Sequence, residues 1–412
     1  MAGEVSLPQN KKTITLALCI LTYIMVYLCR LNFSAAVLKI SGALGVSTAV
    51  MGSVGSLFFL SYALGQLVNG FIGDRVSPIY FIIFATVGTG AVNLAMTGAD
   101  SIAWVRLLWV LNGYFQSIFW ATCNRLLSYY YAPGEHHIVS TGMSLSMVAS
   151  YILSWAVLGK LLLHASWQSY FLIPAIVAGC TLGLWFIFAH WEKGLQKTVA
   201  AQATLNRRAL TSTMNRELLW LVCCTCIFIG LVKEGIGLWA PVIFLNILGG
   251  DINQSLLLIV VIPLGNFAGI MGAQKLLQRP GANPYRILLG MLGAMAGAAL
   301  GIGVFSRFSA LAAVFFTAAV SGLALGCNSI LLSFIPLSYA QENIVATLIG
   351  IFDFAAYLGA AFSAYVLGVF LDEGNWTVIP YFWFAAALLG LSLTAWRCRW
   401  LARRKKTTPK KP

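Results

Sequence analysis

Four charged side chains lie deep inside long apolar stretches of the sequence: Arg30, Lys233, Glu234 and Asp353. A charge at the centre of a bilayer costs at least about 2.5–3.5 kcal/mol, so such residues usually face a cavity or a partner. Arginine can hold a phosphate or carboxylate through two hydrogen bonds, and lysine adds a compact second charge. These residue types predict an anion site made by Arg30 and Lys233, unless the four charges only pair with one another and hold helices together.

Two tyrosines precede Arg30 in the run "YIMVYLCRLNF". Tyr23 and Tyr27 stand seven and three residues before it, and these offsets place all three side chains on one face of a helix. Their hydroxyls can then donate hydrogen bonds to the anion that Arg30 holds. Packing inside the helix bundle and anchoring at the membrane interface are the alternative roles.

The two buried acids leave more than one interpretation open. Adjacent residues of a helix point about 100° apart, so Glu234 need not pair with Lys233. Asp353 can neutralise the surroundings of Lys233 and Glu234, or carry a proton. Structural pairing and proton coupling both remain hypotheses for the two acids.

The composition places these charges in a membrane protein. The chain of 412 residues is 59% hydrophobic and only 9% charged, with a mean hydropathy of +0.84, whereas a soluble domain carries about a quarter charged residues. We expect an all-α integral membrane protein with twelve transmembrane helices. The apolar runs that predict them cover residues 13–38, 48–73, 78–97, 102–130, 138–163, 168–190, 216–247, 254–276, 285–305, 309–335, 343–371 and 377–400.

The runs fall into two sets of six, separated by the longest polar stretch, 191–215. We therefore predict two pseudo-symmetric six-helix bundles, 1–190 and 216–412, joined by a cytoplasmic linker, with a basic cytoplasmic tail at the end. Arg30 follows the last basic residue before it by 18 residues, and Lys233 does so by 17. Matched charges in the two halves are typical of parallel transporter repeats.

The distribution of basic residues predicts the orientation. With the N-terminus in the cytoplasm, 20 of the 26 basic residues fall on the inner side and only four on the outer side, which satisfies the positive-inside rule with both termini cytoplasmic. The net charge of +14 is therefore assigned to orientation and not to nucleic-acid binding. We expect no cleaved signal peptide, and the short loops favour the inner (plasma) membrane of a bacterium.

Other functional classes have no support in the residues. The sequence contains no GxxxxGK[ST] phosphate-binding loop, which argues against ATP-driven transport. The sequence shows no nucleophile–base pair and no metal-ligand spacing that packing does not explain as well. We therefore expect no enzyme activity, no cofactor and no metal. The expected molecule is a monomeric secondary transporter.

The segment "GFIGDRVSP", from Gly70 to Pro78, resembles the loop 2–3 signature of the major facilitator superfamily. Asp74 and Arg75 occupy the signature positions. The resemblance implies a fold of two six-helix bundles and a role in conformational gating for Asp74, Arg75 and Arg125.

Three stretches are similar to the organophosphate:phosphate antiporter family, which includes transporters of glycerol-3-phosphate, hexose phosphate and glucose-6-phosphate. They are "YLCRLNFSAAV", "FQSIFWATCNR" and "VKEGIGLWAPVIFL", and the resemblance covers nearly the whole chain. It implies that Arg30 binds phosphate beside Tyr27 and Tyr23, and that Lys233 occupies a basic position. It also implies substrate contacts by Gln66, Gln116, Trp120 and Trp239.

The departures from this family bear on the substrate. Gln66 stands where glycerol-phosphate and hexose-phosphate carriers have a lysine, Ser146 stands where many members have a histidine, and the acids Glu234 and Asp353 are additional. The predicted site therefore carries less positive charge than that of a simple phosphate-ester carrier. A substrate with one negative charge, or with a cationic part as well, fits it better than a dianion.

Three functions follow as hypotheses. The first is exchange of a small phosphorylated or carboxylated metabolite by alternating access, with inorganic phosphate as a possible counter-substrate. The second is proton-coupled symport or efflux of a zwitterionic or singly anionic solute, with Glu234 or Asp353 as the titrating group. The third is a ligand sensor that keeps the transporter fold.

Overall fold

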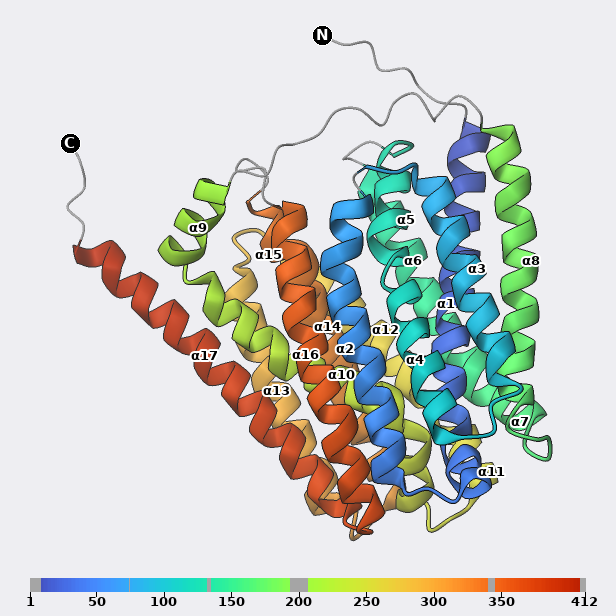
Figure 1. Cartoon of the computed structure of the whole chain (residues 1–412). Helices are drawn as coiled ribbons and strands as arrows, with labels where there is room; N and C mark the ends of the chain where they lie inside the picture. The colour runs from blue at the N-terminus through green and yellow to red at the C-terminus, as the bar shows by residue number, and fades with distance from the viewer. Residues whose placement is uncertain (1–8, 74, 132–134, 193–206, 340–344, 408–412) are drawn as a thin grey trace. The chain divides into compact units, whose positions relative to one another are not determined.

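The computed structural model describes residues 9–73, 75–131, 135–192, 207–339 and 345–407 (Figure 1). Every regular element among these residues is a helix. Within these described ranges, ten helical runs are long and apolar enough to cross a membrane. These runs are Asn10–Leu44, Thr48–Gly70, Pro78–Met96, Ser169–Trp191, Leu219–Ile247, Ile252–Leu277, Pro284–Phe305, Ala310–Phe334, Thr347–Asp372 and Trp376–Arg404.

The other two predicted spans coincide with interrupted helices. The fourth span is α4 (Ile102–Gln116) followed by α5 (Phe119–Ser128). The fifth is α6 (His136–Tyr151), a π-helical segment η2 (Ile152–Leu158) and α7 (Gly159–Leu161). The predicted all-helical membrane architecture is therefore confirmed, and all twelve predicted spans coincide with helical segments.

The remaining bounds are as follows. The helices before the polar stretch are α1 (Gln9–Leu44), α2 (Thr48–Gly73), α3 (Pro78–Met96) and α8 (Ser169–Trp191). Those after it are α9 (Arg207–Arg216), α10 (Leu219–Ile247), α11 (Ile252–Leu258), α12 (Val261–Leu277), α13 (Pro284–Phe305), α14 (Ala310–Ser329), η4 (Ile330–Phe334), α15 (Ile335–Leu337), α16 (Val345–Asp372), η6 (Trp376–Val378) and α17 (Ile379–Thr407).

Contacts divide the chain into two compact units. Unit 1 consists of residues 1–46 and 64–202, and unit 2 of residues 47–63 and 203–412. Helix α2 is thus divided, because its first part packs in unit 2 and its second part in unit 1. The bundle boundaries predicted from the sequence stay a prediction, and α9 lies at the end of the predicted linker.

In unit 1, α1 is held by buried amide side chains next to Arg30. Asn32 Nδ2 donates to Asn93 Oδ1 of α3 at 2.8 Å, and Asn112 Nδ2 of α4 donates to the Cys29 carbonyl at 2.8 Å. Buried polar groups need such partners, the more so where the surrounding solvent is lipid. These bonds fix the position of α1 along its axis at the depth where Arg30 lies.

In unit 2, small residues let helices approach closely. A Cβ atom at Gly230 would overlap the Ala356 carbonyl, and one at Gly359 would overlap the Ile227 carbonyl. Helices α10 and α16 therefore touch backbone to backbone, as is typical of small-residue interfaces in membranes. Because α10 carries Lys233 and α16 carries Asp353, this contact positions two of the buried charges.

The first part of α2 packs on α16 within unit 2. The backbone N–H and the hydroxyl of Thr48 both donate to Asp372 Oδ1, at 3.1 and 2.9 Å. One turn further on, Gly52 leaves no room for a side chain against the Ala364 carbonyl. Near the unit boundary the rings of Tyr62 and Tyr357 lie 4.2 Å apart.

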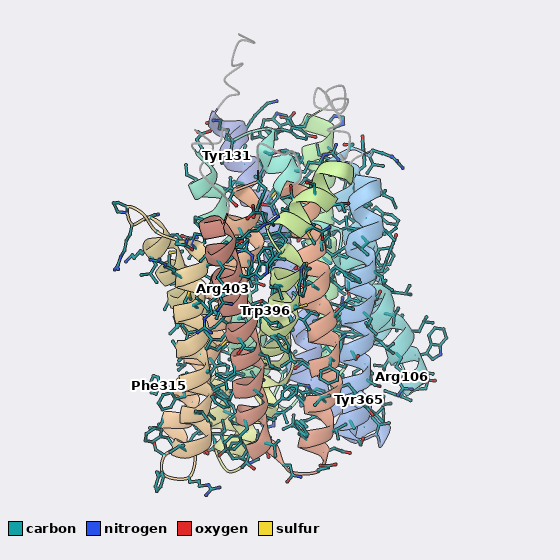
Figure 2. All side chains as sticks on the ribbon, turned by 90° about the vertical axis from the view of Figure 1, so that its left-hand side faces the viewer. Arg106, Tyr131, Phe315, Tyr365, Trp396 and Arg403 are labelled. Atoms are coloured by element: carbon teal, nitrogen blue, oxygen red, sulfur yellow. The ribbon has the colours of Figure 1, made fainter. Side chains whose placement is uncertain are left out.

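Large apolar and aromatic side chains cover the outside of the helices (Figure 2). Phe315 of α14 is 61% exposed, and Tyr365 of α16 is 50% exposed. In water such a surface would be unfavourable, whereas lipid chains solvate it. This distribution agrees with helices that span a bilayer.

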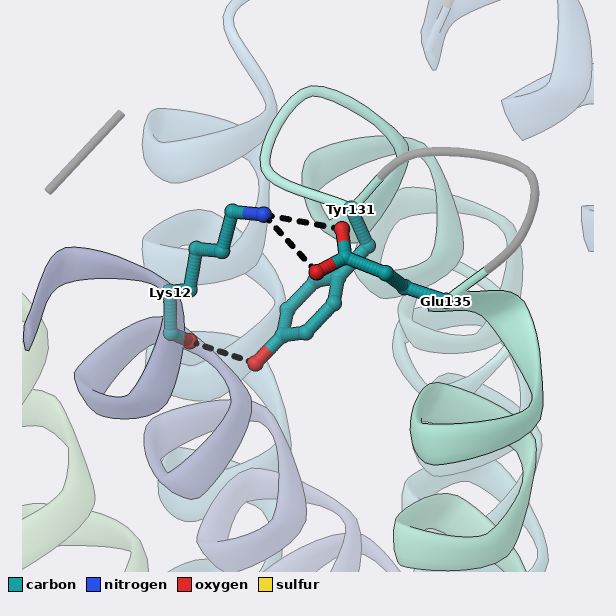
Figure 3. A network of polar contacts seen from close by, with 3 residues as sticks. All are labelled: Lys12, Tyr131 and Glu135. Atoms are coloured by element: carbon teal, nitrogen blue, oxygen red, sulfur yellow. Dashed lines mark hydrogen bonds and ion pairs between the residues drawn. The ribbon is translucent and has the colours of Figure 1, made fainter. Parts of the chain in front are cut away.

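Ion pairs hold the beginning of α1 in unit 1 (Figure 3). Lys12 Nζ contacts both carboxylate oxygens of Glu135, at 2.8 and 3.0 Å, and the Tyr131 hydroxyl donates to the Lys12 carbonyl at 3.0 Å. Lys11 pairs with Glu192 at 2.6 Å. Burial and the nearby Glu135 carboxylate raise the pKa of Tyr131, so its hydroxyl stays protonated as a donor.

Candidate functional site

In unit 1, Arg30 contacts a neutral amide and an aromatic ring. The residue is only 8% exposed, and its Nε donates to Gln116 Oε1 at 3.0 Å. Its guanidinium lies 5.2 Å from the centre of the Tyr27 ring, a distance at which a cation and an aromatic face attract. Gln116 Nε2 in turn donates to the Cys29 carbonyl at 3.1 Å, so the amide is held in the orientation that accepts from Arg30.

The interruption of the fourth span follows directly after Gln116. Helix α4 ends at this residue, and the N–H of Ile118 bonds to the Phe115 carbonyl three residues earlier. Ser117 accepts a hydrogen bond from Asn69 Nδ2 of α2 at 2.7 Å. The packing of α2 on α4 therefore fixes the end of α4, and with it the amide that orients Arg30.

Aromatic rings continue from Arg30 along α1. Tyr23 lies 5.7 Å from Tyr27, measured between ring centres, and 5.3 Å from Trp120 of α5. The contacts of Tyr27 with Arg30 and with Tyr23 confirm the shared helix face that the spacing predicts. Tyr27 therefore borders the guanidinium, and the row continues from it through Tyr23 to Trp120. Their hydroxyl and indole groups can donate hydrogen bonds to an anion, and their rings can stack on a ring.

Sequence reasoning missed Tyr151 and Trp155 of the fifth span. The Tyr151 ring lies 5.7 Å from the Tyr27 ring and 4.8 Å from the Trp155 ring. The spacing of four residues in "SYILSW" indicates a shared helix face. It does not indicate which helix this face meets, because that depends on how the helices pack.

Lys233 lies in unit 2 as half of an ion pair. Its Nζ is 2.9 Å from Glu234 Oε1, and the two side chains are 10% and 8% exposed. The ammonium also lies 5.6 Å from the centre of the Tyr357 ring of α16. The pairing that the sequence left open therefore occurs, and it links two neighbouring residues of one helix.

Asp353 belongs to the same part of unit 2. It precedes Tyr357 by one turn of α16 and is 7% exposed. Helices α10 and α16 are in close contact, so Asp353 and the Lys233–Glu234 pair lie on two helices that pack together. The formal charge of this group is negative when both acids are ionised.

The predicted spans of unit 1 differ from those of unit 2 in their charged residues. The acids of residues 1–202 all fall outside the predicted spans: Glu4, Asp74, Asp100, Glu135 and Glu192. The sequence therefore places Arg30 deep in a segment of the chain that supplies no carboxylate at that depth. An anionic ligand is the kind of group that such an arginine can bind.

The other predicted substrate contacts have different surroundings. Gln66 is half-buried on α2, one turn before Asn69. Trp120 contacts Tyr23 and is half-buried. Trp239 is fully buried, and its indole N–H donates to the Ala364 carbonyl at 3.0 Å, so its polar atom takes part in the packing of α10 on α16.

Of the predicted gating residues, two can be described. Arg125 Nη1 reaches the Val76 carbonyl in the loop after α2 at 3.4 Å, and its Nε donates to the Tyr129 hydroxyl at 3.0 Å. Arg75 is exposed in that loop, and Asp74 lies outside the described residues. The end of the fourth span is thus tied to the loop that carries the signature.

The chain belongs to the Major Facilitator Superfamily, whose family model matches residues 19–364. This match confirms the predicted transporter fold, and with it an integral, multi-pass membrane protein that is a transporter and not an enzyme.

Two of the curated relatives described here cover most of the chain, and a third covers about half of it. The probable hexose phosphate transport protein of Chlamydia pneumoniae is 24% identical over 94% of this chain and 91% of its own length. Membrane sensor protein UhpC of Escherichia coli (strain K12) is 24% identical over 87% and 85%. The glycerol-3-phosphate transporter of Bacillus subtilis is 23% identical over 52% and 53%. The resemblance to the organophosphate:phosphate antiporter family is thereby confirmed.

Solved structures agree on the fold. The nucleoside transporter NupG superimposes with a TM-score of 0.70 at 13% identity, covering 95% of this chain and 99% of that one. The peptide transporter POT in complex with alafosfalin gives a TM-score of 0.72 at 14% identity, covering 97% and 96%. At this identity the likeness concerns the fold and not the substrate.

Proposed function

We propose that this protein is a secondary active transporter that exchanges a small organic anion, a phosphorylated or carboxylated metabolite, by alternating access. The observation that carries the proposal is the buried arginine Arg30, oriented by Gln116 and bordered by Tyr27. Relatives that are named as transporters of hexose phosphate and of glycerol-3-phosphate support a phosphate ester as the substrate class.

In the proposed site, Arg30 is the main contact of the anion. The hydrogen bond from its Nε to Gln116 fixes the plane of the guanidinium, and the planar fork can then donate two hydrogen bonds to oxygens of a phosphate or carboxylate. Tyr23 and Tyr27 donate to the same group. The rest of the substrate is contacted by Gln66, Gln116 and Trp120. Trp239 stabilises the packing of α10 on α16.

Lys233 is the second cationic contact in the proposal. An anion that binds Lys233 must compete with Glu234, which lies 2.9 Å away. This competition lowers the affinity for the anion in unit 2, and it favours a singly charged substrate or one with a cationic part near Glu234 and Asp353. That one anion meets both Arg30 and Lys233 rests on their matched positions in the two halves of the sequence.

The finer parts of the proposal concern topology and gating. Both termini lie in the cytoplasm, the membrane is a bacterial inner membrane, and the protein acts as a monomer. Inorganic phosphate is the proposed counter-substrate. Arg75 and Arg125, together with Asp74, act at the loop after α2 when the transporter changes conformation, a role supported by the contact of Arg125 with Val76.

Proton coupling is the second candidate function. The observation that favours it is the ion pair of Lys233 with the adjacent Glu234, close to Asp353. Protonation of either acid would change the charge of this group. In this candidate function, transport of the substrate is driven by a proton gradient and not by exchange for a counter-anion.

Sensing is the third candidate function, and the similarity to a membrane sensor protein favours it. A sensor would bind the anion through the same Arg30 cluster and would turn over slowly. Ligand binding alone therefore does not separate sensing from transport, and flux has to be measured.

The test uses purified protein in proteoliposomes preloaded with inorganic phosphate, an organophosphate or buffer alone. Exchange predicts uptake of labelled substrate only into vesicles that contain a counter-anion, with no stimulation by an imposed pH gradient. Uptake driven by the pH gradient without a counter-anion would replace exchange by proton coupling. Saturable binding without uptake under either condition would replace transport by sensing.

A further inference from the structure

The last helix of the chain is longer than the hydrocarbon core that it crosses. Helix α17 has 29 residues, or about 43 Å at about 1.5 Å per residue, whereas the core is about 30 Å thick. No acidic residue follows Glu373, and eight basic residues follow from Arg397 onward. The final turns of α17 therefore carry a dense positive charge at or beyond the membrane interface.

Two tryptophans and two arginines share one face of these turns. Trp396, Trp400, Arg403 and Arg404 have the spacing i, i+4, i+7 and i+8, which aligns them along a helix. Trp396 is 55% exposed and Trp400 is 37% exposed, and both arginines are exposed. Figure 2 shows Trp396 and Arg403 at the same end of α17.

The aromatic rings on this face contact one another and the charges. Trp220, at the beginning of α10, meets Trp396 edge to face, with ring centres 6.1 Å apart. The Arg404 guanidinium lies 5.2 Å from the centre of the Trp400 ring. We call these five residues, Trp220, Trp396, Trp400, Arg403 and Arg404, the tryptophan–arginine face.

A sixth residue, Arg397, fixes the direction in which this face points. It is only 2% exposed, its guanidinium lies 3.8 Å above the Tyr285 ring of α13, and its Nε donates to the Glu217 carbonyl at 2.8 Å. These contacts hold one side of α17 against α13 and the beginning of α10. The neighbouring side, which carries Trp396 and Trp400, is left exposed beside Trp220 of α10.

We propose that the tryptophan–arginine face is a binding site for the headgroup of an anionic phospholipid. Tryptophans are enriched at the headgroup level, where an amphipathic ring meets both chains and water. Arginine binds phosphate oxygens in a fork, and basic clusters next to a membrane helix attract anionic lipids. The face supplies both features on adjacent turns of one fixed helix, and the proposal does not depend on which solute the protein transports.

The test measures lipid binding by native mass spectrometry of the full chain in a neutral detergent, with phosphatidylglycerol and phosphatidylcholine at equal concentration. The wild type is expected to retain phosphatidylglycerol in preference. Each basic residue near an anionic surface contributes about fivefold in affinity, so Arg403→Gln with Arg404→Gln should weaken phosphatidylglycerol binding about 30-fold. Loss of the stacking ring in Trp400→Ala should weaken it about two- to fivefold.

Arg307→Gln is the matched control. Arg307 is also an exposed arginine of unit 2 beside an exposed aromatic residue, Phe308, but it follows the end of α13 opposite to Tyr285. This variant should bind phosphatidylglycerol as the wild type does. Arg403→Lys with Arg404→Lys keeps the charge and should retain most of the affinity, which separates lost charge from a lost fold.

Three results would overturn the proposal. The first is unchanged phosphatidylglycerol affinity in the double glutamine variant, and the second is an equal loss in Arg307→Gln. The third is displacement of the lipid by inorganic phosphate at the same concentration, which would make the face a site for small anions. Arg30→Gln should leave lipid binding intact, so failure of the transport proposal is distinguishable from failure of this one.

Discussion

The Arg30 region and the Lys233 region each hold a cation inside the membrane, but they stabilise it through different contacts. Arg30 is oriented by a neutral amide and an aromatic ring, in a part of the chain whose acids all lie outside the spans. Lys233 is paired with the carboxylate of the next residue, and Asp353 lies in the same region. The matched positions of the two cations in the sequence therefore do not make them equivalent.

This difference assigns unequal tasks to the two cations. At Arg30 an anion adds charge-assisted hydrogen bonds to a guanidinium that a neutral amide orients, whereas at Lys233 it must displace or share the carboxylate of Glu234. We therefore expect Arg30 to supply most of the affinity and Lys233 to tune which charge state of the substrate is accepted. The predictions below test this asymmetry in order of decreasing effect.

The largest effect is expected at Arg30. Arg30→Gln should lower the rate of anion exchange at least about 100-fold, because hydrogen bonds to charged groups contribute about 1.5–3 kcal/mol each and the fork makes two. Arg30→Lys should recover part of the rate through its charge. The measurement is the initial rate of counter-anion exchange in proteoliposomes. Lys160→Gln, at an exposed lysine of unit 1, is the control and should exchange normally.

The ion pair of unit 2 gives the second prediction. Lys233→Gln leaves Glu234 buried without its cation, so exchange should fall about 10- to 30-fold and the protein should lose stability. The double variant Lys233→Gln with Glu234→Gln should be less harmful than the single one. Glu234→Gln alone should raise the affinity for doubly charged phosphate esters. A double-mutant cycle in thermal unfolding and exchange rate that gives purely additive effects would contradict the pairing.

A substitution at Gln116 can make the surroundings of Arg30 resemble those of Lys233. Gln116→Glu places a carboxylate beside Arg30, so the anion must now compete as it does at Lys233, and exchange should fall about tenfold. Gln116→Leu removes only the orienting bond and should raise KM about two- to tenfold, in line with a net hydrogen-bond contribution of about 0.5–1.5 kcal/mol. Concentration series of substrate uptake would separate the two variants. If Gln116→Leu lowers exchange as much as Gln116→Glu does, the loss results from changed packing and not from the added charge.

The aromatic neighbours give the smallest effects. Tyr27→Phe keeps the ring next to Arg30 but removes the hydroxyl that is proposed to donate to the anion, so the affinity should fall about two- to fivefold. Tyr357→Phe keeps the ring next to Lys233 and should change the affinity less than about twofold. Equal affinities of the two variants would mean that the Tyr27 hydroxyl does not donate to the substrate. Binding isotherms with one organophosphate are sufficient to compare the two.

Much of the fold was predictable because hydropathy and helix length are direct consequences of the bilayer. The twelve apolar runs, the polar stretch 191–215 and the shared face of Tyr23, Tyr27 and Arg30 follow from local patterns. The interruption after Gln116 and the π-helical segment η2 were not predictable in this way. Both depend on which neighbouring helix takes up the released backbone groups or the crowded side chains.

The sequence could not decide whether Lys233 pairs with Glu234, for a similar reason. Spacing along a helix describes where Cβ atoms point, and adjacent residues diverge, but two long side chains can bend toward each other. The contact of Tyr27 with Tyr151 likewise joins two spans that are far apart in sequence. Sequence identifies the chemical groups, and the packing decides which of them meet.

The central claim, that Arg30 is the main anion contact, is tested most directly by ligand-induced thermal stabilisation. Purified wild type and Arg30→Gln would be compared against the same panel of phosphate esters, phosphonates, carboxylates and zwitterions. A ligand at 100 times its Kd stabilises the protein by about 2.7 kcal/mol. The account predicts that at least one organic anion raises the Tm of the wild type and has no effect on Arg30→Gln. Equal stabilisation of both proteins by that anion would contradict it.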